Sequence, residues 1–378
     1  MRTAPIVLLG LLVAVPAHAQ FGSIVNKAQK VKEKTDDLSI SDSEERELGD
    51  RVSQQLIDKY GVYQDKDVTK YVSLVGGVVA RESTRPTLNW KFIVLDTDGV
   101  NAFAAPGGII HVTRGLLGLT KNEAELAGVL GHEITHVAAK HTVRAIQQGK
   151  VVSLGSDAAG QGSTRDEILS KLSQHAYHML LDGEFSRDDE NEADEKGVRL
   201  ANKLGYDPHG LVDVLEKIDA RNSGREDRNG LFASHPATKD RIAKLEKQIA
   251  AEKLSAKATV EARYEKNIHV EAKPVSELAL NVDGAAGLAG GDSKSAAKPA
   301  DKKDEKSTTK EEAPKKKGGM FGKIGLTSGA QGQNTQTVAS AGARGGVPDR
   351  DAKGGPNKTR VVVTVSAAEL DAFKKGIV

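Results

Sequence analysis

The amino-acid sequence predicts a mainly helical α+β domain with a small sheet, followed by a disordered tail. Apolar residues recur at helical spacing in most stretches between residues 44 and 254, and two short runs rich in β-branched residues lie between residues 90 and 113. Beyond Ala285 the chain has too few apolar residues to fold. With 378 residues, 38% of them hydrophobic and 4% aromatic, we expect one folded domain with less ordered flanks.

Residues 1–19 are typical of a secretory signal peptide. Arg2 precedes the short apolar run from Ile6 to Val15, and the small residues Ala17 and Ala19 follow, so cleavage is expected after Ala19. A membrane anchor is the weaker alternative, because spanning a bilayer needs about 18 apolar residues. The absence of cysteine agrees with export to an oxidising compartment. We expect an exported protein whose mature form has no membrane span.

The first helix of the domain is expected from Glu44 to Tyr60, after a polar, lysine-rich N-terminal extension over residues 20–40. Ser41 or Ser43 is suitably placed to cap it. The same periodicity predicts helices over Asp67 to Ser83, Asp166 to Leu181, Asp188 to Leu204, Pro208 to Arg221 and Pro236 to Leu254, with a loop from Gly155 to Gly162.

Two strands are expected between the second and third of these helices. Trp90 to Asp96 is a β-branched and aromatic run bounded by turn residues. A Pro106-Gly107-Gly108 turn introduces a second strand or hairpin arm from Ile109 to Thr113, which should end just before a helix that includes residues 132–136.

The C-terminal third of the chain divides by composition. Residues 255–284 form an extension of the domain, and residues 285–356 a low-complexity linker. Residues 357–378 hold a strand-like run from Arg360 to Val365 and a short helix from Ala367 to Lys375 that Ser366 would cap. This last piece is too small to fold alone, so we expect it to dock on the domain or on a partner.

The pentapeptide from His132 to His136 carries the most chemical information. On a helix, residues four apart share a face, so both imidazoles can hold one zinc ion while Glu133 lies beside a metal-bound water. The surrounding residues are apolar around nearly the whole helix, which is typical of a buried helix. Buried imidazoles and a carboxylate are costly without a partner, and a metal ion is a suitable one. This pattern indicates a metallopeptidase.

A catalytic zinc ion usually takes three protein ligands and leaves one position open. Ser186 and Asp189 resemble a capping box, so a helix should begin there, with Glu190 and Asp194 on one closely packed face. A buried carboxylate pair needs a cation, which favours Glu190 on the metal and Asp194 behind a histidine ligand. The alternative is a solvated acidic helix start.

Four motifs in this order resemble peptidase family M48 over about residues 41 to 250. They are Asn101 to Leu116, His132 to His141, Ser186 to Asp194, and Ser234 to Thr238 with Arg241 and Ile242. The resemblance implies His132, His136 and Glu190 as ligands of one Zn²⁺ per chain, Glu133 as general base, and a gluzincin-type metallopeptidase domain, which we assign to residues 41–254. It also implies a periplasmic endopeptidase for misfolded or envelope proteins, active in protein quality control.

Some features of the family do not carry over to this chain. It lacks the membrane-spanning helices of some members and the tetratricopeptide repeats of others, so repeat-based partner binding is not implied. Polypeptide substrates are expected, and a net charge of +2 gives no indication of a nucleic acid partner. The C-terminal tail is a candidate binding segment for an envelope protein.

The remaining candidate residues concern substrate binding and access. If the second strand lies at a sheet edge, Ala104, Ala105, Gly107 and Gly108 could hold an extended peptide by main-chain hydrogen bonds, although an ordinary structural strand fits the pattern equally well. His235 could reach the open metal position or stabilise the transition state, or simply lie beside a helix entry. His141 lies about 140° around a continuous helix from His136, so it is not expected to bind the same metal.

Two other functions are compatible with these residues. A gated, chaperone-like quality-control factor with low proteolytic activity could keep the metal site closed through His235. A structural zinc protein would have its fourth coordination position permanently filled.

Overall fold

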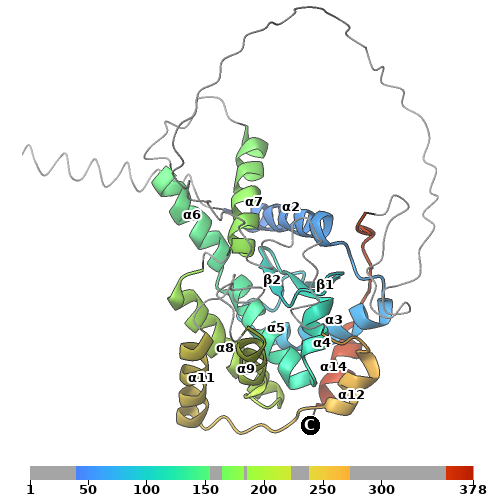
Figure 1. Cartoon of the computed structure of the whole chain (residues 1–378). Coiled ribbons are helices and arrows are strands. Elements are labelled where there is room, and N and C mark those ends of the chain that lie inside the picture. Colours follow the sequence, from blue (N-terminus) through green and yellow to red (C-terminus); the bar gives the residue numbers. More distant parts are fainter. Residues whose placement is uncertain (1–39, 154–163, 183–184, 223–237, 273–354, 378) are drawn as a thin grey trace, which may run out of the picture.

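The structure is a computed structural model that describes residues 40–153, 164–182, 185–222, 238–272 and 355–377 (Figure 1). Its longer helices are α2 (Asp42–Tyr60), α3 (Lys66–Arg81), α5 (Glu123–Ala138), α6 (His141–Ser153), α7 (Arg165–Asp182), α8 (Arg187–Leu204), α9 (Gly210–Asn222) and α11 (Thr238–Glu252). The shorter ones are α4 (Arg114–Leu119), α12 (Glu261–Asn267) and α14 (Ala367–Lys375). The predicted mainly helical α+β class with a small sheet is confirmed. Within these residues no helix has the length and hydropathy needed to cross a bilayer.

Side-chain caps determine where the predicted helices begin. The Ser41 side chain accepts the backbone N–H of Glu44, and the Glu44 side chain accepts that of Ser41, so α2 starts two residues before the predicted Glu44. Ser186 caps α8 in the predicted way by accepting the N–H of Asp189. The predicted loop from Gly155 to Gly162 lies outside the described residues.

The sheet has three strands, β1 (Lys91–Leu95), β2 (Ala102–Ala105) and β3 (Ile109–Thr113), in the order β1-β3-β2. β1 is parallel to β3, and β2 is antiparallel to it. The turn between β2 and β3 contains Gly107 and Gly108 at φ 76° and 101°, a region that favours glycine. The second predicted strand is therefore a hairpin with β2 at the sheet edge. The expectation that this strand ends just before the helix with residues 132–136 is wrong, because α4 lies between β3 and α5.

Helix α5 lies at the centre of the molecule (Figure 1). Every residue from Glu123 to Val137 is buried, and α3, α8, α9 and β2 all pack against the helix. Its apolar side chains join the main hydrophobic core with α3, α8 and α9, whereas α2, α7 and part of the sheet enclose a second core. The buried setting predicted for the pentapeptide helix is present.

Residues beyond 254 complete the main core. Arg263 of α12 donates two hydrogen bonds of 2.5 Å to buried Glu123 of α5, whose carboxylate also accepts the hydroxyls of Tyr71 and Tyr206. Tyr264 is buried beside them. The segment expected as an extension thus packs onto the helical body at least as far as α12.

The C-terminal residues also dock on the domain. Helix α14 packs along α3 so closely that a Cβ on Gly77 would lie 2.7 Å from Leu370, and Ile377 is buried in the main core. The predicted strand from Arg360 to Val365 is wrong. Residues 361–365 alternate between half-buried and exposed, as in a strand, but no ladder of backbone hydrogen bonds forms there within the described chain.

Candidate metal centre

Two glycines bring helices α5 and α8 into direct backbone contact. A Cβ on Gly131 would lie 2.8 Å from the carbonyl oxygen of Gly197, and a Cβ on Gly197 would lie 2.7 Å from the backbone nitrogen of His132. Any larger residue would push the helices apart. This contact places Glu190, two turns before Gly197 on α8, beside the histidines of α5.

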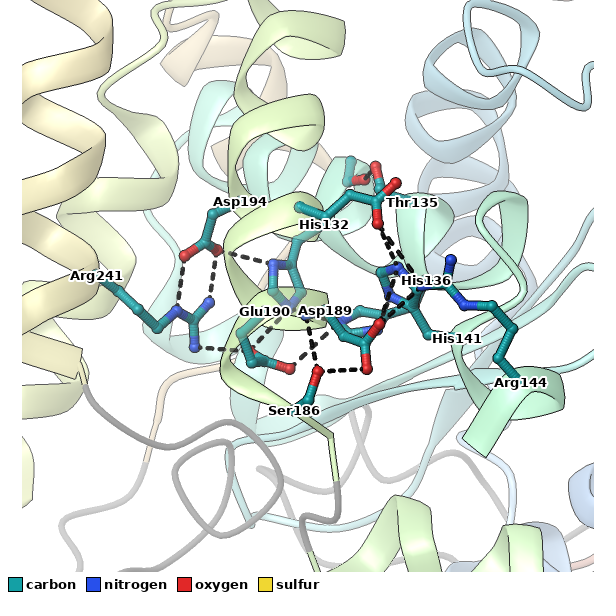
Figure 2. A network of polar contacts seen from close by, with 12 residues as sticks. His132, Thr135, His136, His141, Arg144, Ser186, Asp189, Glu190, Asp194 and Arg241 are labelled. Carbon is teal, nitrogen blue, oxygen red and sulfur yellow. Dashed lines mark hydrogen bonds and ion pairs between the residues drawn. The ribbon is translucent and has the colours of Figure 1, made fainter. Parts of the chain in front are cut away.

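Three side chains direct their donor atoms to one point in the interior (Figure 2). The Nε2 atoms of His132 and His136 are 3.0 Å apart, and the Glu190 carboxylate lies 3.7 Å from the first and 3.4 Å from the second. All three residues are buried. Tetrahedral zinc with bonds of about 2.0–2.1 Å separates its ligands by about 3.3 Å, so this donor set fits a zinc ion with only small adjustments.

Asp194 and Arg241 hold the imidazole of His132 through its Nδ1 atom (Figure 2). Asp194 Oδ1 lies 2.9 Å from His132 Nδ1, and Arg241 donates two hydrogen bonds of 2.7 Å to the same carboxylate. Burial alone would raise the pKa of Asp194, but the Arg241 guanidinium and His132 lower it to about 2. An ionised Asp194 accepts the Nδ1–H of His132, which leaves the Nε2 lone pair directed at the proposed metal position.

Glu133 follows His132 on α5 and is 1% exposed. Burial lowers the pKa of Arg241, whereas the charges of Asp194, Glu190 and Glu133 hold it above the usual range. Arg241 also lies 3.2 Å from Glu190 through Nη1. One buried guanidinium therefore offsets only part of the charge of these three carboxylates, and a cation among the donors would offset more of it.

His141 contacts the other histidine in a way that the helical wheel did not predict. Helix α5 ends at Ala138, and Lys140 adopts φ 58°, so the helix is interrupted before α6 begins at His141. His141 Nδ1 then lies 2.8 Å from His136 Nδ1. Its imidazole does not reach the proposed metal position, but it contacts a ligand of that position.

The residues expected to hold substrate separate into two groups. Ala104 and Ala105 lie on β2, whose other side pairs with β3, at the edge of the sheet next to α5. Gly107 and Gly108 lie in the turn, where the Gly107 N–H donates to Glu45 and a Cβ on Gly107 would clash with the α2 backbone. Those two glycines are positioned by the fold of the turn.

The sequence interpretation missed Arg241 as a site residue, although it formed part of a motif. Helix α11 buries Arg241, Leu245 and Ile249, which are spaced four residues apart, so a cation lies within an otherwise apolar stripe. A charged residue at an apolar position of a helix was the signal that could have identified Arg241. His235 lies outside the described residues.

The chain is similar to several known proteins. Residues 67–249 match the model of peptidase family M48. The beta-barrel assembly-enhancing protease of Escherichia coli (strain K12) is 27% identical over 217 residues, which are 54% of this chain and 44% of that protein. Metalloprotease LoiP of the same strain is 29% identical over 221 residues, 57% of this chain and 84% of LoiP.

A eukaryotic protein is also similar. The mitochondrial metalloendopeptidase OMA1 of Schizosaccharomyces pombe is 32% identical over 178 residues, 47% of this chain and 52% of OMA1. The chain thus spans about half of the length of this relative and less than half of the beta-barrel assembly-enhancing protease.

Proposed function

Because residues 67–249 of this chain match the model of peptidase family M48, we propose that the protein is a zinc-dependent endopeptidase. One observation supports this most directly: two imidazoles from α5 and one carboxylate from α8 converge in a buried cluster with the spacing of zinc ligands. His132, His136 and Glu190 would hold one Zn²⁺ per chain. The oxygen and nitrogen donors suit zinc, and buried Asp194 fixes one of the imidazoles.

The reaction would divide between the metal and Glu133. His132, His136 and Glu190 would hold the zinc ion, which would supply Lewis-acid chemistry for the scissile carbonyl and the attacking water. The Glu133 carboxylate takes the proton from the attacking water and returns it to the leaving amine. Asp194 and Arg241 hold His132 in the tautomer and orientation that this geometry needs.

The substrate would be an extended polypeptide bound along the outer edge of β2 at Ala104 and Ala105. Edge strands bind peptides through main-chain hydrogen bonds, and β2 lies next to the helix that carries Glu133. With the expected signal peptide over residues 1–19, the site of action would be the bacterial periplasm, on misfolded or envelope proteins in quality control. We also propose that the C-terminal tail binds an envelope protein.

A Glu133→Gln variant tests the proposed chemistry. The amide keeps the size of the side chain but cannot take a proton, so casein cleavage should fall to background while one zinc ion per chain remains bound. Glu195→Gln, on the exposed side of α8, is the matched control and should cleave like the wild type. Full cleavage by the Glu133→Gln protein would refute the assignment.

The gated, chaperone-like alternative uses the same zinc site and differs only in access. In that version the wild type holds zinc but cleaves casein slowly, and His235→Ala raises the rate. An unchanged rate in His235→Ala would argue for an open site.

A further inference from the structure

His136 is held through its second ring nitrogen by a chain of polar groups that ends on α8. His136 Nδ1 lies 2.8 Å from His141 Nδ1, and His141 Nε2 lies 3.2 Å from Glu192 Oε2 and 3.6 Å from Asp189 Oδ1. His136 and His141 are 1% and 0% exposed, so water does not compete for these contacts. Figure 2 shows the two imidazoles beside Asp189.

The order of donors and acceptors along this series of polar groups is determined by the proposed metal position at one end and the carboxylates of α8 at the other. If His136 binds zinc through Nε2, its ring proton is on Nδ1 and is donated to His141. His141 Nδ1 must then accept, so the proton of His141 is on Nε2, where it meets a carboxylate that only accepts. Glu192 and Asp189 therefore select the tautomer of His141, and His141 selects that of His136.

We propose that His141 is a positioning residue that fixes the tautomer and ring angle of the zinc ligand His136. The inference rests on the proposed zinc site and adds a second support to it. His132 is oriented by a carboxylate directly, through Asp194, whereas His136 is oriented by a carboxylate through an intervening imidazole. The α5–α6 turn at Lys140 provides the geometry, because a continuous helix would carry His141 away from His136.

The same residues resemble a second metal site, and the proton order excludes it. His141, Asp189 and Glu192 offer donor atoms within 4.8 Å of one another. A metal on His141 Nε2 would place the His141 proton on Nδ1, facing the Nδ1–H of a zinc-bound His136 at 2.8 Å. Arg144 and Lys196 already form ion pairs with the two carboxylates. One zinc ion per chain is therefore expected.

Zinc affinity of two His141 variants tests the proposal. Asn keeps an oxygen acceptor close to the position of Nδ1, whereas Leu has a similar size and no acceptor. By competition with a chromogenic chelator, His141→Leu should bind zinc about 10–100-fold more weakly than the wild type, and His141→Asn should recover most of that loss. His175→Leu, an exposed histidine on α7, is the control and should bind like the wild type.

Glu192→Leu provides a second measurement if His141→Leu does not fold, because the Glu192 side chain is 32% exposed. It should weaken zinc binding several-fold in the wild type and have no effect in the His141→Asn background, where the relay is already cut. Three results would overturn the inference and leave the proposed function standing. They are equal zinc affinities for the wild type and His141→Leu, equal losses of affinity in His141→Leu and His141→Asn, and an unchanged zinc affinity in Glu192→Leu. A wild type that binds no zinc would overturn both.

Discussion

Arg241 of α11 and Asp194 of α8 form a buried two-point pair, with Nε and Nη2 of the guanidinium each 2.7 Å from a carboxylate oxygen. The pair links α11, the last long helix in the sequence, to His132 through Asp194. Its position means that folding of the last long helix and formation of the metal centre depend on the same two charges.

Replacing Arg241 by Met should therefore affect stability and metal binding together. Asp194 would be left buried without its cation, which costs about 3–5 kcal/mol when one partner of a buried pair is removed. Urea denaturation of the metal-free protein measures the loss, and chelator competition measures weaker zinc binding. Lys244→Met, on the exposed side of the same helix, should change neither quantity. Wild-type stability in Arg241→Met would contradict this role.

Gly197→Ala should separate α5 from α8. The new Cβ would lie 2.7 Å from the His132 nitrogen, and overpacking of this kind costs about 1–3 kcal/mol. Because Glu190 moves with α8, zinc affinity should fall as well. Glu195→Ala, on the exposed face of α8, is the control. Unchanged zinc affinity in Gly197→Ala would show that the contact does not determine the position of Glu190.

The C-terminal helix should stabilise the domain on which it docks. Ile377 is 3% exposed in the main core, so Ile377→Ala should cost about 2–5 kcal/mol. Val362, 78% exposed in the preceding segment, is the matched control and its change to Ala should cost almost nothing. Truncation after residue 354 should lower the melting temperature at least as much as Ile377→Ala does. A truncated protein as stable as the full chain would mean that α14 contributes nothing to the fold.

His111 should make stability depend on pH. This histidine is completely buried on β3 beside Ser53, and burial lowers its pKa to about 3. Since its unfolded pKa is about 6.5, protonation favours the unfolded chain, so the contribution is complete above pH 6.5 and is lost as the pH falls towards 3. The expected loss between pH 7 and pH 5 is about 2 kcal/mol, measured by urea denaturation.

The control for this prediction is the double variant His111→Leu with Ser53→Ala, which removes both polar partners. Its unfolding free energy should fall less steeply over the same pH range. Parallel pH profiles for the double variant and the wild type would assign the acid sensitivity to other groups.

Periodicity and cap residues predicted most long helices and strand β1, because each of these elements follows a regular local pattern. Glu190 could also be predicted, since it shares a helix face with small residues and a second carboxylate. His141 could not, because its position depends on the positive φ of Lys140, which breaks the helix on which the argument relied. The short helix α14 was predicted with its observed bounds, because Ser366 caps it. Helix α12 was not predicted, because it is short and buries a single large residue, Tyr264.

The central claim concerns where one zinc ion binds, and the most direct measurement is a crystal structure of zinc-loaded Glu133→Gln protein with anomalous data at the zinc edge. We predict one peak per chain, about 2.0–2.2 Å from Nε2 of His132, Nε2 of His136 and a Glu190 carboxylate oxygen. A peak beside His141 and Glu192 instead, or none among the three predicted ligands, would contradict the account.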